Sequence, residues 1–536
     1  MSQNPDEHQK EEESGAYKWF ALIAIVLGAF VAVLNNSLIN VALPKLMAVF
    51  GSSTEDIQWV LTGYMLASAV VIPMSGFAGD KFGYKKIFLL SLSGFTISSF
   101  LCGLAWSDTS LIVFRIIQGL TGGFIMPLSM AIIYSIMPRH QIGMALGLWG
   151  IAAMVAPAVG PTLSGYLIEV ASWRWLFFLS LPIGVFAIVM GSILLRETPK
   201  KEHITFDLPG AVLSIVFFGT LLLALSKGQS EGWTSLYIVS LFFVSFFSML
   251  LLVWVETGKE YPILDLRFFK NPTFTLSTLC SGFVMVGLFG GVFLTPLYLQ
   301  NIQGLSAIDT GLVLMPQSIA MALMMPISGK LFDRFGVVPL GLIGLTILGT
   351  TTYELHRLTM DTPNEWLDMI LTIRGIGIGL CMMPLTTAGM NAVERSEVGR
   401  ASSVSNVFRQ VMGSLSIAVL TSIMSARQTF HAAGISEHLQ MDSDATTGAI
   451  KMLGSVFALG GVDAGTAQGG AVALIAGMVQ KEALVRSIAD TFLLSSIPVF
   501  ICIPFIFFFI KRKKSSAPDA SAKMKPQNQP SASAQG

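Results

Sequence analysis

Long apolar runs of about 20 residues recur along almost the whole chain, and short polar turns separate them. A run of this length is what an α-helix needs to cross the hydrocarbon core of a bilayer. We count about fourteen such runs. The predicted spans are 17–38, 59–78, 86–105, 109–136, 143–168, 173–195, 208–226, 236–255, 275–299, 310–331, 338–358, 367–389, 400–425 and 488–510. The pattern therefore predicts an all-α integral membrane protein.

The composition agrees with this prediction. Of the 536 residues, 53% are hydrophobic and 12% are charged. A soluble domain carries roughly 25% charged residues, so the composition excludes a soluble enzyme and a nucleic-acid-binding protein. The four cysteines lie in apolar runs without the C-x-x-C spacing of a metal or redox site: Cys102, Cys280, Cys381 and Cys502. We therefore expect no metal and no other cofactor.

Lysines and arginines are distributed unevenly between successive turns. They concentrate in the turns that follow even-numbered spans, as at Lys85, Arg139 and Lys201, and they are sparse after odd-numbered spans. Cytoplasmic loops of membrane proteins carry this excess of positive charge. We therefore expect a multi-pass protein of the cytoplasmic membrane with both termini in the cytoplasm. The polar ends, 1–16 and 511–536, are predicted to be disordered cytoplasmic tails.

One motif occurs twice, at the ends of the second and tenth spans. Residues 76–83 and 329–336 share the pattern G-x-x-x-D-[KR]-F-G, and Arg115 in the fourth span is echoed by Arg374 in the twelfth. An Asp at a helix end beside basic groups makes a charge cluster that can form in one conformation and break in another. The candidate gating residues are Gly76, Asp80, Lys81, Gly83 and Lys85 in the first copy and Gly329, Asp333 and Arg334 in the second.

This repeat predicts the domain organisation. Both echoes fall in register if the chain forms a six-helix bundle over 17–200 and a second six-helix bundle over 271–510. Two further helices and a linker, 201–270, lie between the bundles. The segment 426–487 is rich in Gly and Ala, and its apolar part is too short to span a membrane. We expect it to be a long extracellular loop, with an interfacial or hairpin segment lying over the outer face.

Several stretches resemble a known family. The first copy of the repeated motif looks like motif A of the major facilitator superfamily, and Leu111-x-x-x-Arg115-x-x-Gln118-Gly119 is similar to its motif B. Residues 156–165 are similar to motif C, the antiporter motif. The matching positions of motif C are Pro157, Gly160, Pro161 and Gly165. Residues 172–178 resemble the sixth helix of the fourteen-helix drug:proton antiporters of the EmrB/QacA type.

The resemblance implies a major facilitator fold of 14 helices, with two extra helices between the six-helix bundles. It also implies a secondary exporter that alternates access between the bundles and is usually driven by inward proton flow. A small-molecule substrate, protons and the lipid bilayer are then its partners. The chain departs from the family at Asn35, where an Asp is common in the first helix. An amide cannot titrate, so this departure leaves the proton carrier open.

Charged side chains inside a span are expensive, so each is a candidate for a functional role. The candidates for coupling are Arg115, Arg409 and Glu354. For Arg115 the alternative is a structural role through carbonyl pairing, and for Glu354 it is an interfacial carboxylate near Arg357. Polar residues predicted near the middle of the substrate cavity are Asn35, Asn36, Asn40, Gln118, Gln317, Asn406 and Gln410.

Two transport functions agree with these residues. The first is export of hydrophobic drugs or amphiphiles, since 27 Met and 37 Phe suit adaptable apolar recognition. The alternative is export of an endogenous neutral or anionic compound such as a lipid, peptide, amino acid or organic acid, which the arginines and Asn35 favour. A membrane enzyme is disfavoured because the six histidines are scattered. No motif identifies a periplasmic adaptor.

Overall fold

The computed structural model describes residues 5–198, 200–201, 203–438, 444–459 and 463–512. In these residues 12 helices are long and apolar enough to cross a membrane, or up to 14 if each of two bent helix pairs counts as one span. The prediction of an all-α membrane protein with about fourteen spans is confirmed.

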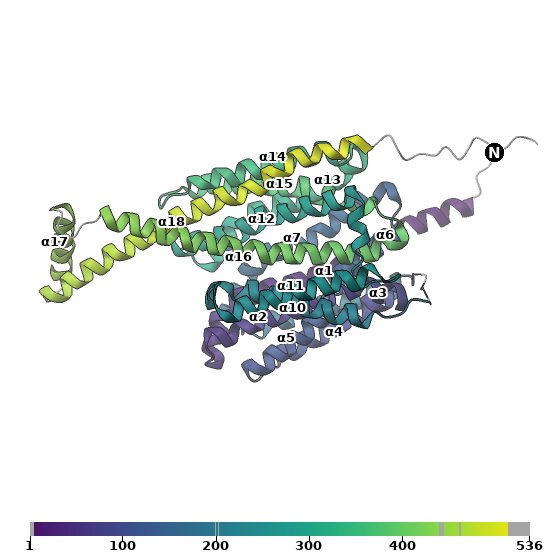
Figure 1. Ribbon diagram of the computed structural model, residues 1–536, viewed down its shortest axis with the longest axis horizontal. Coiled ribbons are helices and arrows are strands. Elements are labelled where there is room, and N and C mark those ends of the chain that lie inside the picture. The colour runs from purple at the N-terminus through teal and green to yellow at the C-terminus, as the bar shows by residue number, and fades with distance from the viewer. Residues whose placement is uncertain (1–4, 199, 202, 439–443, 460–462, 513–536) are drawn as a thin grey trace, which may run out of the picture.

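The helices of the chain lie side by side in two groups (Figure 1). The first group contains α1 (Pro5–Phe50), α2 (Thr54–Val71), α3 (Met74–Phe82), α4 (Tyr84–Gly103), α5 (Asp108–Gly122), α6 (Ile125–Ile136), α7 (Ile142–Val170), α8 (Trp175–Phe178) and α9 (Ser180–Leu194). The second contains α12 (Pro272–Asn301), α13 (Ala307–Phe335), α14 (Val337–Glu354), α15 (Asn364–Asn391), α16 (Val398–His438), α17 (Asp444–Leu459) and α18 (Ala464–Ile506). Short 3-10 helices are η1 (Arg139–Gln141), η2 (Leu266–Lys270), η3 (Leu355–Arg357), η4 (Arg395–Glu397) and η5 (Phe507–Arg512).

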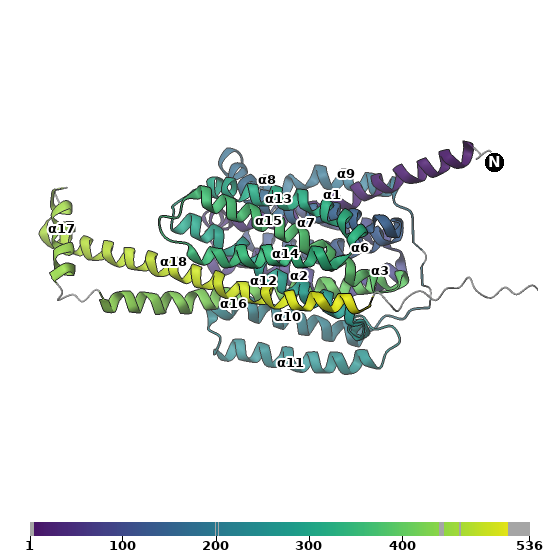
Figure 2. The ribbon, with the colours of Figure 1, turned by 90° about the horizontal axis from the view of Figure 1, so that it is seen from above.

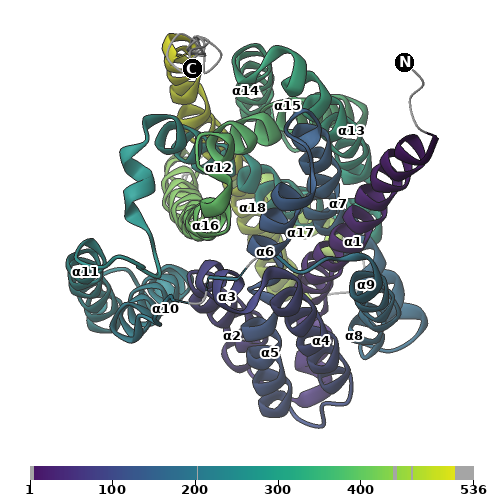
Figure 3. The same ribbon diagram turned by 90° about the vertical axis from the view of Figure 1, so that its right-hand side faces the viewer.

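Two further helices follow the first group in the chain: α10 (Leu208–Glu231) and α11 (Leu236–Thr257). We call this pair the insert. In the insert, α10 packs against α2 and α16 as well as against α11. Large apolar side chains of α11 face outward, such as Trp254, which is 75% exposed. The insert therefore lies on the flank of the molecule, with α11 outermost (Figures 2 and 3).

Polar caps and glycines set the ends of the spans. Ser107 caps α5 through a reciprocal capping box with Ser110, and Ser306 caps α13 through the backbone N–H of Asp309. Gly83 and Gly336 connect α3 to α4 and α13 to α14 with φ of 97° and 79°. Residues with a Cβ rarely adopt these angles. Both copies of the repeated motif therefore end in a backbone conformation that glycine adopts without strain.

Two spans are bent. The helices α2 and α3 meet at 55° around Pro73, and α7 bends by 40° near Pro157. Proline removes a backbone donor and clashes with the preceding turn, which explains both bends.

Two ends of the bundles can be told apart. We call the end that contains Gly83 and Gly336 the motif end, and the end that contains Gly51 and Gly304 the loop end. A helical hairpin formed by α16 and α18 projects from the loop end, and α17 packs across α18 near its tip (Figures 1 and 2).

The structure differs from the sequence-based expectation at two segments. Most of the predicted tail 1–16 belongs to α1, since this stretch is rich in Glu, Gln and Lys, which favour helices. The expected loop 426–487 is largely helical and projects away from the bundles. Its α18 portion is rich in Ala and begins at a capping Asp463. The predicted tail beyond residue 512 lies outside the described residues.

Candidate functional site

Asp80 is the centre of an ion-pair cluster at the motif end. The last turns of α3 carry its side chain, and the residue is 6% exposed. Its carboxylate accepts hydrogen bonds from Tyr84 Oη and Lys201 Nζ, each at 2.8 Å, and lies 3.7 Å from Arg400 Nε. Tyr84 comes from α4, Lys201 from the linker before the insert and Arg400 from α16. We call these four residues, with Asp265, the latch.

Arg400 joins the latch to the linker that follows the insert. Its guanidinium donates to Asp265 Oδ2 at 3.1 Å and to Glu397 at 2.9 Å. Hydrogen bonding to Asp265 also raises the pKa of Arg267. Lys201 fastens the preceding linker twice, because its backbone N–H donates to the Asp80 carbonyl and its Nζ to the Ser396 carbonyl. Both linkers of the insert therefore end in the latch.

Glycine makes this approach of the two bundles possible. A Cβ added to Gly76 would lie 2.9 Å from the Arg400 Cα. That distance is too short for any neighbour that cannot move, so a side chain at position 76 would push α3 away from α16. The prediction that Gly76 belongs to a gating motif is consistent with this packing.

The basic residues of the motif itself point elsewhere. Lys81 donates to the Ile204 carbonyl, and Lys85 donates to the Ser192 carbonyl. Among the described residues, neither lysine forms an ion pair with Asp80. The chain supplies Lys201, Asp265 and Arg400 instead, and in the sequence these look like ordinary loop charges.

The second copy of the motif lies in different surroundings. Asp333 is exposed and accepts one hydrogen bond from the backbone N–H of Gly143, at 3.2 Å. Gly329 packs directly against the backbone of Gly143, and Arg334 lies over the ring of its neighbour Phe335. This copy joins the bundles through backbone at the start of α7 and not through an ion-pair cluster.

Further contacts hold the bundles together at the motif end. Ser402 Oγ donates to the Pro127 carbonyl at 3.2 Å, and Ser403 Oγ donates to the Ile72 carbonyl at 2.6 Å. Arg395 reaches the Met137 carbonyl across the same interface. The motif end is therefore closed in this conformation.

Arg115 lies at the centre of a buried polar network in the first bundle. It is fully buried on α5 and donates to Asn35 Oδ1 at 2.9 Å, Gln118 Oε1 at 2.7 Å and the Val60 carbonyl at 3.0 Å. Its guanidinium also lies 4.1 Å from the centre of the Tyr64 ring. The structure thus brings three of the predicted residues together.

The partners of Arg115 are uncharged. Asn36 Oδ1 completes the set at 3.3 Å, and Asn35 Nδ2 donates onward to Ser99 and Ser180. A buried charge is costly unless it is paired, and amides and carbonyls only solvate it. The network therefore keeps a net positive charge and leaves the buried Gln118 Nε2 without a partner among the described residues.

The second bundle carries Arg374 at the position that echoes Arg115. Arg374 is fully buried on α15 and donates to the Gly287 carbonyl and, at 3.3 Å, to Thr352 Oγ1. Its Nη1 has no hydrogen-bond partner among the described residues.

The other coupling candidates lie apart from Arg115. Arg409 of α16 donates to Asn406 Oδ1 at 2.8 Å, so the structure brings these two predicted residues together. Glu354 ends α14 and pairs with Arg357 at 3.1 Å, as the interfacial alternative predicts. Within the described part of the chain, three of the cavity candidates make no side-chain hydrogen bond: Asn40, Gln317 and Gln410. Of these, Asn40 is exposed and Gln317 is buried.

The antiporter motif packs α7 against α1. Ser37 Oγ donates to the Pro157 carbonyl at 3.0 Å, and Ser164 Oγ donates to the Leu38 carbonyl at 2.6 Å. Gly160 faces Ser37, and Gly165 lies toward Ile308 of α13. Small residues and a free carbonyl next to proline allow this close approach.

Among the described residues, no group of three or more His, Cys, Asp or Glu side chains could hold a metal ion. The site consists instead of helices long and apolar enough to cross a membrane, a closed motif end held by ion pairs, and buried charges inside the bundles. These features define a membrane transporter.

The chain belongs to the Major Facilitator Superfamily, whose family model matches residues 25–417. It is 40% identical over 416 residues to the uncharacterized MFS-type transporter YhcA of Bacillus subtilis (strain 168), covering 78% of each chain. It is 31% identical to the probable multidrug resistance protein EmrY of Escherichia coli (strain K12), covering 78% of this chain and 82% of that one. The expected resemblance to EmrB-type proteins is thereby confirmed.

The fold is similar to that of the proton:xylose symporter XylE. The TM-score is 0.61 at 11% identity, and the match covers 93% of this chain and 96% of that chain. This likeness supports the predicted major facilitator fold.

Proposed function

We propose that the protein is a secondary exporter of hydrophobic drugs or amphiphiles that works by alternating access. The observation that carries the proposal is the closed motif end, where Asp80 binds Lys201 of the linker and lies beside Arg400 of the opposite bundle. Ion pairs of this kind can form in one conformation and break in another. Opening of the latch would expose the interior of the bundles at the motif end.

The proposed topology places the motif end and both termini in the cytoplasm. The excess of Lys and Arg in the turns of the motif end supports this orientation. The described conformation is then closed to the cytoplasm, and the hairpin of α16 and α18 projects outside the cell.

The proposed energy source is inward proton flow, in exchange for substrate. The resemblance to drug:proton antiporters supports it, and the name of the relative EmrY supports drugs as substrates. Asn35 cannot carry the proton on α1, so the proposal requires an acid elsewhere in the chain.

A second candidate function is export of an endogenous neutral or anionic compound. The buried Arg115 favours it, because its described partners are amides, a carbonyl and an aromatic ring. An anionic substrate group would supply the missing negative charge. A cation would meet a net positive network there.

Uptake into everted membrane vesicles tests both candidates. The probes are radiolabelled chloramphenicol, which is neutral, an anionic fluorescein and dicationic dequalinium, each measured with and without an imposed pH gradient. Uptake of chloramphenicol that needs the gradient and disappears in Asp80→Asn supports the leading proposal. Gradient-independent equilibration of every probe would contradict it, and uptake of the anion alone would favour the second candidate.

A further inference from the structure

The two bundles face each other along two lateral seams that differ. The first, which we call the covered seam, runs between α2–α3 and α16. The insert covers it, because α10 packs against both α2 and α16 and Gln229 of α10 accepts a hydrogen bond from Ser422 of α16 at 3.2 Å. The second, which we call the open seam, runs between α7 and α13. Side chains along it, such as Leu323 at 63%, are exposed on the flank of the molecule.

The open seam is sealed at the motif end. There Gly143 and Gly329 meet backbone to backbone, and a Cβ added to Gly147 would lie 2.5 Å from the Met325 carbonyl oxygen. Helices that approach this closely leave no room for a passing molecule. Anything that enters the seam must therefore enter from its other half.

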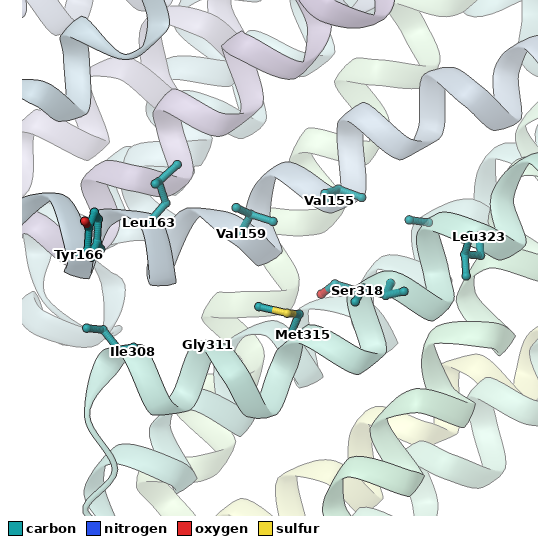
Figure 4. Close-up of a pocket in the computed structure, with 11 residues that line it drawn as sticks. Val155, Val159, Leu163, Tyr166, Ile308, Gly311, Met315, Ser318 and Leu323 are labelled. Carbon is teal, nitrogen blue, oxygen red and sulfur yellow. The ribbon is translucent and has the colours of Figure 1, made fainter.

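Toward the loop end the two helices separate around an apolar pocket (Figure 4). Its volume is about 460 Å³. Val155, Val159 and Leu163 line it from α7, and Met315 and Ser318 are among its residues from α13. The bend of α7 near Pro157 tilts its second half relative to the first, which explains why the seam widens here.

Some residues that line the pocket are buried and others are exposed. Gly311 and Ser318 are buried, whereas Ile319 and Tyr166 are 52% and 56% exposed. Hydroxyl groups of Ser318 and Tyr166 are the polar side-chain groups among the lining residues. The pocket is thus a hollow in the flank of the molecule, with an exposed outer rim and a buried floor.

The depth of the pocket corresponds to one leaflet. From Val155 to Tyr166 the chain advances 11 residues along α7, or about 16 Å at 1.5 Å per residue. Half of a hydrocarbon core of about 30 Å has nearly the same depth. On α13 the lining is longer, from Ile308 to Leu323, or about 22 Å. The pocket therefore lies mainly in the leaflet at the loop end and reaches the middle of the membrane. That leaflet is the outer one under the proposed topology.

We infer that the open seam holds the long hydrocarbon chain of the transported amphiphile while its head occupies the interior of the bundles. This inference rests on the proposed exporter function and names its substrate class: single-chain amphiphiles with a neutral or anionic head. Three observations carry it: the apolar lining, the seal at the motif end and the insert over the opposite seam. The tail has one lateral exit, and that exit leads into the loop-end leaflet.

The pocket can be filled at one position without touching the latch. Gly311 lies in its wall, and a Phe there would occupy the space of the hydrocarbon chain. The probes are 5-(dodecanoylamino)fluorescein and 5-(acetylamino)fluorescein, which share an anionic head and differ in chain length. Initial rates of uptake into everted vesicles are measured for both, with chloramphenicol as the reference substrate.

Gly311→Phe should slow the dodecanoyl probe about tenfold, the effect of losing roughly two buried methylenes of contact. The acetyl probe and chloramphenicol should stay within about twofold of the unaltered protein, because they do not reach the seam. Gly311→Ala should give an intermediate effect. The matched control is Gly219→Phe on α10, which adds the same side chain outside the pocket, at a position where an added Cβ would meet no atom within 4 Å. It should change neither rate.

Equal slowing of both fluoresceins by Gly311→Phe, or of neither, would overturn the inference. Equal slowing is the result expected of damaged packing, and the lack of any slowing is expected if a resident lipid chain fills the pocket. If the unaltered protein transports chloramphenicol but not the dodecanoyl probe, the inference fails and the exporter function stands. If it transports no probe at all, both fail. Should Gly311→Phe not reach the membrane, Ile319→Trp on the exposed rim provides the same comparison.

Discussion

The two copies of the motif at the motif end share a sequence pattern but not a chemistry. Asp80 is buried between a tyrosine, a lysine and an arginine, whereas Asp333 is exposed and accepts a backbone N–H. The difference comes from what surrounds each motif. Among the described residues, the linkers of the insert supply Lys201 and Asp265 to the surroundings of the first copy. A repeated motif therefore fixes the turn and the close helix packing, and its neighbours decide whether the acid becomes part of an ion-pair latch.

The two buried arginines at equivalent positions of the bundles also differ in their surroundings. Arg115 has several polar partners and a tyrosine ring, whereas Arg374 has a carbonyl, a threonine and an unpartnered Nη1 among the described residues. Symmetric positions thus hold charges with different degrees of solvation. Arg115 is the better candidate for contact with a substrate.

The largest expected effect separates the two motif acids. Asp80→Asn should abolish export while leaving membrane insertion intact, because losing charge-assisted hydrogen bonds of about 1.5–3 kcal/mol each removes the preference for the closed motif end. Asp333→Asn should lower the rate only about twofold, since its amide oxygen can still accept from Gly143. Transport by both variants is measured in vesicles and normalised to protein in the membrane. Full export by a well-inserted Asp80→Asn protein would remove this role.

A second test asks whether the latch depends on its most buried cation. Arg400→Met removes the partner that Asp80, Asp265 and Glu397 share, although Asp80 keeps Lys201 and Asp265 keeps Arg267. We expect a loss of about tenfold in transport, because the variant loses the charge-assisted contacts that join α16 to the linker after the insert. Lys201→Met should cost about twofold or less, since its side chain is 35% exposed and exposed pairs contribute little.

Both latch variants need a control at a basic residue of the motif. Lys85→Met is suitable, because Lys85 donates to a carbonyl and not to Asp80. A larger loss in Lys85→Met than in Arg400→Met would show that the motif's own charges matter more than those from α16.

The third effect concerns the arginines. Arg115→Met should reduce turnover about fivefold while the protein still inserts into the membrane, because a buried guanidinium inside a span is costly unless it is used. Arg409→Met should behave in the same way. Arg374→Met should keep export within about twofold, since the hydrogen bonds of Arg374 go to Gly287 of α12 and Thr352 of α14 and so join helices of one bundle. Normal export by Arg115→Met or Arg409→Met would reassign that residue to packing.

The smallest expected effect is a change of charge selectivity. Asn35→Asp places a carboxylate beside Arg115 and cancels its charge, so uptake of dicationic dequalinium should rise by about threefold relative to chloramphenicol. The matched control is Asn40→Asp on the same helix, where the side chain is exposed and makes no described hydrogen bond. Strong dequalinium export by the unaltered protein would show that another acid, such as Glu354, already supplies the charge.

The membrane fold was predictable because the period and length of apolar runs report directly on helices and spans. Gly76 and Asp80 were found through their repetition. Their partners were not, because Lys201 is 121 positions from Asp80 and meets it only after the chain has passed through the sixth span. A loop lysine carries no local signal of such a contact.

In the projecting hairpin, the hydropathy pattern failed to predict the secondary structure. Its residues lack an apolar run long enough to span a membrane, so the hydropathy pattern predicts a loop. Helix propensity of the Ala-rich stretch and the cap at Asp463 favour the continuous α18.

The network around Arg115 was predicted only in part. Asn35, Asn36 and Gln118 were among the candidates, whereas Ser99, Ser180 and Tyr64 join it from other helices and could not be identified from spacing alone.

The exposure of Lys201 has a consequence for the medium in which the protein works. One cation of the latch is in contact with solvent, and mobile ions screen such charges over a Debye length of about 8 Å at 0.15 M salt. Concentrated salt therefore weakens the ion pair between Lys201 and Asp80 without changing the protonation of either group. The fraction of molecules with a closed motif end should therefore fall with ionic strength, by no more than the loss of the Lys201 ion pair would cause.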